Sequence, residues 1–96
     1  MQSKNYEKLI DEFIEDLRLQ GRAEGTLLEY EMRLKEFAEF FQLKALALDQ
    51  VKKSDLTEFM EQKLSNCLKV STIRGKLSTF RVFCLWAVRK GYMPEV

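Results

Sequence analysis

The longest amphipathic segment of the sequence is residues 71–90, which read STIRGKLSTFRVFCLWAVRK. Apolar side chains recur there every three or four positions, the spacing that places them on one side of an α-helix. We expect Ser71 to cap the start of this helix, Gly91 to end it and Pro94 to prevent it from resuming. The side chains expected to face a core are Ile73, Leu77, Phe80, Phe83, Cys84, Ala87 and Val88.

Three earlier segments show the same period, and we expect helices over about residues 5–20, 24–42 and 54–66. Gly21 is expected to end the first of them, and Ser54 to cap the third. Their core-facing side chains are expected to be Tyr6, Leu9, Ile10, Phe13, Ile14 and Leu17, then Leu27, Tyr30, Leu34, Phe37, Ala38 and Phe41, and finally Leu56, Phe59, Met60 and Leu64.

The connection over residues 43–53 supplies further apolar anchors, which we expect to be Leu46, Leu48 and Val51. No strand pattern, internal repeat or linker interrupts the sequence. We therefore expect one all-α domain over residues 1–96.

The residue counts exclude several kinds of chemistry. The sequence has no histidine, which removes a Ser-His-Asp triad and any His-ligated zinc. Cys67 and Cys84 form no Cys-x-x-Cys pair. The longest apolar run, residues 82–88, is far too short to span a membrane, and the N-terminus has no signal-peptide pattern. We expect a cytoplasmic protein with no catalytic residue, metal or cofactor in this chain.

Charge is distributed unevenly along the sequence. Residues 1–48 carry seven Lys/Arg and ten Asp/Glu, a net of −3, whereas residues 49–96 carry nine and five, a net of +4. Residues 62–94 hold seven basic residues and no acidic one. Such a stretch indicates either a polyanionic partner or a solvated helix face that lacks acids.

The side of the last helix opposite its apolar stripe carries small and hydroxylic residues between arginines: Ser71, Gly75, Ser78, Val82 and Arg89, flanked by Arg74 and Thr79. Small residues let a backbone approach a surface closely, and arginines suit phosphate oxygens. This pattern favours a helix that lies in a DNA major groove. The alternative is a surface helix whose interior glycine costs about 1 kcal/mol relative to alanine.

Four apolar residues interrupt the amphipathic patterns. Leu28 and Met32 sit among charges on the second segment, and Leu85 and Trp86 disturb the end of the last one. The tryptophan fits either a small core or an interface with a missing partner.

The ordered motifs of the sequence resemble the N-terminal core-binding domain of phage integrases, the tyrosine recombinases. The resemblance rests on three runs that together cover essentially the whole chain: Phe13-Ile14-Glu15-Asp16-Leu17-Arg18 followed by Gly21, Thr26, Tyr30, Leu34 and Phe37; Val51-Lys52-Lys53-Ser54-Asp55-Leu56; and Ser71-Thr72-Ile73-Arg74 followed by Leu77, Phe80, Arg81, Phe83, Gly91 and Pro94. It implies an orthogonal four-helix bundle of SAM-like fold.

The resemblance also implies a function in double-stranded DNA binding for DNA integration and recombination. The second and fourth helices would face the major groove, and the expected partners are DNA, a C-terminal catalytic domain of the same full-length protein and other recombinase protomers. Phosphate donors would be Thr26, Ser71 and Thr72; charge would come from Lys35, Arg74, Lys76, Arg81 and Arg89; and Gly75, Ser78 and Thr79 would lie closest to base edges.

Three departures and two rivals accompany this expectation. Lys52 stands where the family has a capping Thr, Met93 precedes Pro94 where the family has Asn, and the second helix is too acidic to match phosphates well. One rival is a SAM-like protein–protein interaction module that uses Leu28, Met32 and Trp86. The other is a stand-alone helix-turn-helix regulator, against which residues 65–70 lack the glycine of a tight turn.

Overall fold

The elements of the protein are seen in a computed structural model, which describes residues 6–93. That range contains the helices α1 (Tyr6–Leu19), α2 (Glu24–Leu43), α3 (Lys53–Ser65) and α4 (Val70–Arg89), with one short 3₁₀ turn, η1 (Leu48–Gln50), and no strand. The expected all-α fold with four helices is confirmed. The expectations placed on Asn5 and Pro94 lie outside the described residues.

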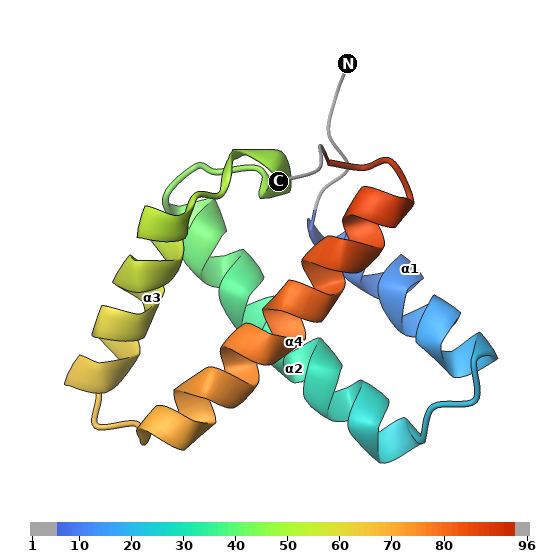
Figure 1. Cartoon of the computed structure of the whole chain (residues 1–96), viewed down its shortest axis with the longest axis horizontal. Helices are drawn as coiled ribbons and strands as arrows, with labels where there is room; N and C mark the ends of the chain where they lie inside the picture. The colour runs from blue at the N-terminus through green and yellow to red at the C-terminus, as the bar shows by residue number, and fades with distance from the viewer. Residues whose placement is uncertain (1–5, 94–96) are drawn as a thin grey trace.

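The two longest helices cross each other. In Figure 1, α4 passes over α2 near the middle of both, while α1 and α3 flank the crossing on opposite sides. α1 packs along α2, and α4 packs across α2. Each helix therefore buries its apolar side against this crossing.

Phe37 of α2 lies at the centre of the crossing. Its ring stacks on that of Phe59 from α3 at 4.0 Å between centroids and on that of Phe80 from α4 at 4.6 Å. A second aromatic group joins α1 to α4, because Phe13 meets Phe83 at 5.3 Å and Trp86 at 5.4 Å. Aromatic rings thus connect all four helices.

Most of the predicted core is confirmed, but Leu64, expected to face inward, is 47% exposed on α3. Trp86, for which the sequence left a core and an interface open, is 5% exposed and donates its indole N–H to Asp16 at 2.7 Å. Because the ring is buried and its N–H is hydrogen-bonded, Trp86 belongs to the core. Leu28 and Met32 are exposed, as the sequence indicated.

The two serine caps predicted from the sequence are wrong. α3 has Lys52 as its N-cap residue, and α4 has Lys69. In α3, the Asp55 carboxylate accepts the backbone N–H of Lys52 at 2.8 Å, so the helix begins before Ser54. The predicted helix ends are better placed: Gly21 and Gly91 adopt φ of 85° and 79° just after α1 and α4.

No helix among residues 6–93 is both long enough and apolar enough to cross a bilayer.

Replacing Phe37 with alanine should be the most destabilising single change at the crossing. We expect Phe37→Ala to cost about 3–5 kcal/mol of unfolding free energy, because it removes a ring packed against two other helices. Phe40→Ala, at a half-buried ring on the same helix, should cost clearly less. Urea unfolding followed by circular dichroism measures both, and equal losses would contradict the central position of Phe37.

Candidate nucleic-acid interface

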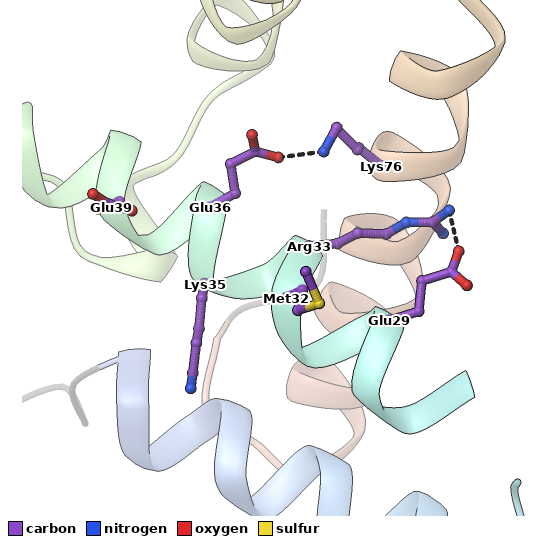
Figure 2. A pocket seen from close by; sticks show the side chains of 7 residues that line it. All are labelled: Glu29, Met32, Arg33, Lys35, Glu36, Glu39 and Lys76. Carbon is purple, nitrogen blue, oxygen red and sulfur yellow. Dashed lines mark hydrogen bonds and ion pairs between the residues drawn. The ribbon is translucent and has the colours of Figure 1, made fainter. Parts of the chain in front are cut away.

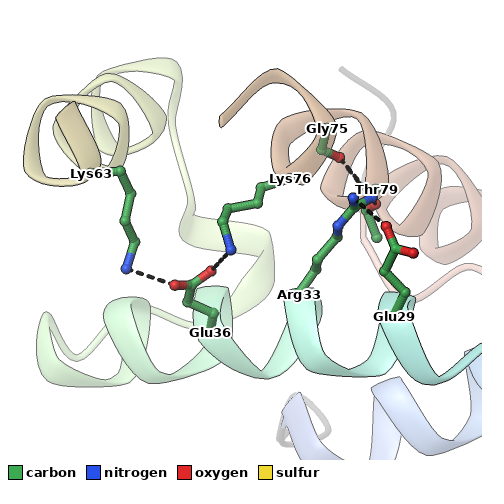
Figure 3. Close-up of polar contacts among 7 residues, drawn as sticks. All are labelled: Glu29, Arg33, Glu36, Lys63, Gly75, Lys76 and Thr79. Carbon is green, nitrogen blue, oxygen red and sulfur yellow. Dashed lines mark hydrogen bonds and ion pairs between the residues drawn. The ribbon is translucent and has the colours of Figure 1, made fainter. Parts of the chain in front are cut away.

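Several cations of the acid-free stretch are bound by carboxylates from the first half of the chain. Lys63 and Lys76 both reach Glu36 of α2, at 2.8 and 2.6 Å between charged atoms, as Figure 3 shows. Lys90 reaches Asp16 of α1 at 3.1 Å. Part of the charge asymmetry read from the sequence is therefore used inside the domain to join its helices.

Four other cations have no ion pair within residues 6–93: Lys69, Arg74, Arg81 and Arg89. All four are exposed. The three arginines follow one another at intervals of seven and eight residues, about two helical turns, so they line one side of α4. We call the exposed set Ser71, Arg74, Ser78, Arg81 and Arg89 the outer stripe of α4.

The N-terminus of α4 adds to the positive character of this region. Its N-cap residue makes no side-chain hydrogen bond, and its first turn holds no acidic residue. Ser71 and Thr72 are exposed there, next to backbone N–H groups that α4 itself leaves without acceptors. The helix dipole favours an anion at such a position.

Thr79 and Gly75 do not lie where the sequence placed them. Thr79, expected near base edges, is 2% exposed and its hydroxyl donates to the Gly75 carbonyl at 3.1 Å. Gly75 is half-buried and faces α2. The exposure expected for Thr79 is wrong, because α2 covers that side of α4.

Arg33 of α2 is the group that approaches Gly75 in the middle of α4. Its guanidinium donates to the Gly75 carbonyl at 3.3 Å and to the Thr79 hydroxyl at 3.0 Å, and it also pairs with Glu29 (Figure 3). A Cβ on Gly75 would stand 3.3 Å from Nη2 of Arg33. The sequence signal for this contact was the mid-helix glycine, which we interpreted as a DNA contact instead.

The other predicted site residues are divided between two places. Lys76 and Lys35 line a groove of about 500 Å³ beside α2, together with glutamates (Figure 2). Thr26 is half-buried in the first turn of α2. The structure thus gathers Ser71, Arg74, Ser78, Arg81 and Arg89 on the outer stripe and leaves Lys35 and Lys76 in the groove. Lys69, exposed at the start of α4, was missed although it belongs to the acid-free stretch.

Four carboxylates that join helices have lowered pKa values: a hydrogen bond from Arg18 of α1 lowers the pKa of the exposed Glu24 of α2, and the other three are less exposed. Hydrogen bonds from Trp86 and Lys90 lower the pKa of Asp16, and hydrogen bonds from Lys44 and from the Lys52 backbone lower that of Asp55. Burial opposes ionisation of Glu36, but the hydrogen bonds from its two lysines outweigh it and lower its pKa. All four groups are therefore carboxylates at neutral pH.

The described residues offer little for other chemistry. No group of three or more His, Cys, Asp or Glu side chains within residues 6–93 could hold a metal ion. Burial raises the pKa of the Cys84 thiol to about 12, so this thiol stays protonated near neutral pH.

The fold and its charges define a small helical domain whose last helix presents to solvent cations that have no ion pair within residues 6–93. The chain belongs to the family described as phage integrase, N-terminal SAM-like domain, which it matches over residues 10–91. Domains of this family generally bind DNA in tyrosine recombinases. The resemblance noted in the sequence is therefore confirmed, and the match assigns these residues to the N-terminal domain rather than to the catalytic domain.

Neither the curated proteins nor the solved structures that were compared with the chain gave a match.

The contact between Arg33 and Gly75 should make alanine at position 75 less favourable than helix propensity suggests. Gly75→Ala in an open helix would add about 1 kcal/mol of stability. Here we expect a smaller gain or a loss, because the guanidinium must shift. In an Arg33→Met background the full gain should appear, and a thermal double-mutant cycle measures the difference. The same gain in both backgrounds would contradict this packing role.

Stability should fall in acid because four linking carboxylates have lowered pKa values in the folded state. Such groups stabilise the fold above their unfolded pKa, near 4, and lose this contribution as pH falls through the lower folded value. We expect the melting temperature to be flat from about pH 7 to 5 and to drop below about pH 4. Asp55→Asn should melt lower at pH 7 and show a shallower drop; melts at each pH test this, and an unchanged profile would argue against Asp55.

Proposed function

We propose that this domain binds double-stranded DNA as the core-binding domain of a tyrosine recombinase, and positions it for a C-terminal catalytic domain of the same full-length protein. The observation that carries the proposal is the outer stripe of α4, whose three arginines are exposed and have no ion pair within residues 6–93. Unpaired cations are the ones that release DNA counterions on binding, since a paired cation must first leave its carboxylate.

The residues of the stripe would take different roles. Arg74, Arg81 and Arg89 would contact phosphates, and Lys69 would add a fourth charge at the start of the helix. Ser71 and Thr72 would donate to a phosphate at the helix N-terminus, where the dipole assists. Ser78, a small residue between two arginines, would lie nearest the bases. Chemistry would belong to the catalytic domain, and other protomers would join in a synaptic complex.

The protein-interaction rival loses part of its proposed surface. Of its three residues, Trp86 is in the core, so only Leu28 and Met32 remain exposed, one turn apart on α2 at 59% and 65%. These two side chains form a small patch, whereas the cations of α4 extend from Arg74 to Arg89, along about four turns of helix. We therefore favour DNA as the partner.

Reversing one charge on the stripe should weaken DNA binding. We expect Arg74→Glu to cost about 1.5–3 kcal/mol, because a charge-assisted contact is lost and a repulsion replaces it. Fluorescence anisotropy on one duplex at several salt concentrations measures this. With four phosphates contacted, log K of the wild type should fall with log[salt] at a slope of about −3.6, and the variant should show a shallower slope.

The matched control is Arg22→Glu, which makes the same charge change at an exposed residue between α1 and α2. It should weaken binding far less than Arg74→Glu. Equal losses in the two variants would mean that only net charge matters, and a wild type that does not bind would refute the proposed function.

A further inference from the structure

Each cation that lines the groove beside α2 lies near a glutamate of α2. Arg33 pairs with Glu29, Lys76 with Glu36, and Lys35 lies 3.9 Å from Glu31. Figure 2 shows the first two pairs together with the groove lining. The groove is lined by three basic residues, Arg33, Lys35 and Lys76, and by three acidic ones, Glu29, Glu36 and Glu39, so its net charge is zero. The outer stripe of α4 has no such carboxylates.

Glu36 differs from the other glutamates because it holds cations from two different helices. One carboxylate oxygen contacts Lys63 of α3 and the other contacts Lys76 of α4, so the Glu36 side chain lies between the two lysines (Figure 3). The side chains of these lysines are only 16% and 17% exposed. A lysine without such a partner would extend its flexible side chain into water. The ion pairs with Glu36 instead keep both ammonium groups close to the surface of the domain.

Lysines that are ion-paired with an internal carboxylate in this way are less available to other anions. A phosphate would have to displace a carboxylate that makes two short, charge-assisted hydrogen bonds in a half-buried setting. Without Glu36, the same two lysines would be unneutralised. Lys76 follows Arg74 by two residues, about 200° around α4, so the added charge would extend the cationic surface from the outer stripe toward the sides of the domain that α2 and α3 form.

We propose that Glu36 is an affinity-determining residue of this domain: it acts as an internal counter-ion that withholds Lys63 and Lys76 from DNA phosphates and confines the backbone contacts to the outer side of α4. The proposal rests on the DNA-binding function proposed above. Removal of the Glu36 carboxylate would therefore lower the stability of the domain and raise its affinity for DNA, because the same carboxylate joins three helices and limits binding.

The test compares Glu36→Gln with Glu39→Gln on one duplex by fluorescence anisotropy, with thermal melts alongside. Both variants remove one negative charge from the same groove, but Glu39 has no ion pair within residues 6–93. Glu36→Gln should melt lower yet bind roughly three- to tenfold more tightly, with a salt slope steeper by about 0.9 for each newly contacted phosphate. Glu39→Gln should leave melting and slope nearly unchanged.

Two further variants locate the origin of the gain. Adding Lys76→Gln to Glu36→Gln should remove much of the added affinity, whereas Lys63→Gln alone should barely alter DNA binding, because the wild type withholds that lysine. The second of these variants keeps the test decisive if Glu36→Gln is poorly folded.

Equal affinities for Glu36→Gln and Glu39→Gln, or a marked loss on Lys63→Gln alone, would overturn the proposal while leaving the DNA-binding function intact. If instead Arg74→Glu binds as well as the wild type, the proposed interface itself fails. The two failures are therefore distinguishable in one set of titrations.

Discussion

The crossing of α4 over α2 is the constraint on which the other features of this domain depend. Phe37 holds it from the α2 side, with Phe80 of α4 and Phe59 of α3 stacked on its ring. Once the two helices cross at this ring, each residue of α4 has a fixed environment. Thr79 and Gly75 face α2 under the reach of Arg33, while Arg74 and Ser78 face solvent. The candidate interface is the part of α4 that the crossing leaves uncovered.

Charge follows the same division. The acidic first half and the basic second half of the chain meet at the sides of the crossing, where Glu36 joins Lys63 and Lys76, and Asp16 joins Lys90. Ion pairs of this partly exposed kind contribute modestly to stability. Their larger effect is on which cations stay outside the pairs. The arginines of α4 have no ion-pair partner among the described residues, so the near-neutral domain presents a locally cationic side. Net charge alone conceals this arrangement.

Gly75 shows how a local signal acquires its meaning from packing. A mid-helix glycine marks a place where something approaches the backbone closely, and the sequence pattern suggested that DNA does so. In the fold the approaching group is the Arg33 guanidinium, which binds the glycine carbonyl. The close approach that the sequence indicated is therefore present, and it is made within the domain.

The sequence by itself determined the number of helices, most of their buried faces, and the glycines at the ends of α1 and α4, because these depend on local periodicity and backbone freedom. It also showed the family, through motifs spread along the chain. Only the tertiary structure decided that Thr79 and Trp86 are buried and which cations of the basic stretch are held by carboxylates. A helical period marks the one face that is apolar, whereas a second face covered by another helix leaves no periodic signal. The contacts of Arg33 with Thr79 and of Glu36 with Lys76 join residues that are 46 and 40 positions apart in the sequence. Such pairs form only once the helices have crossed.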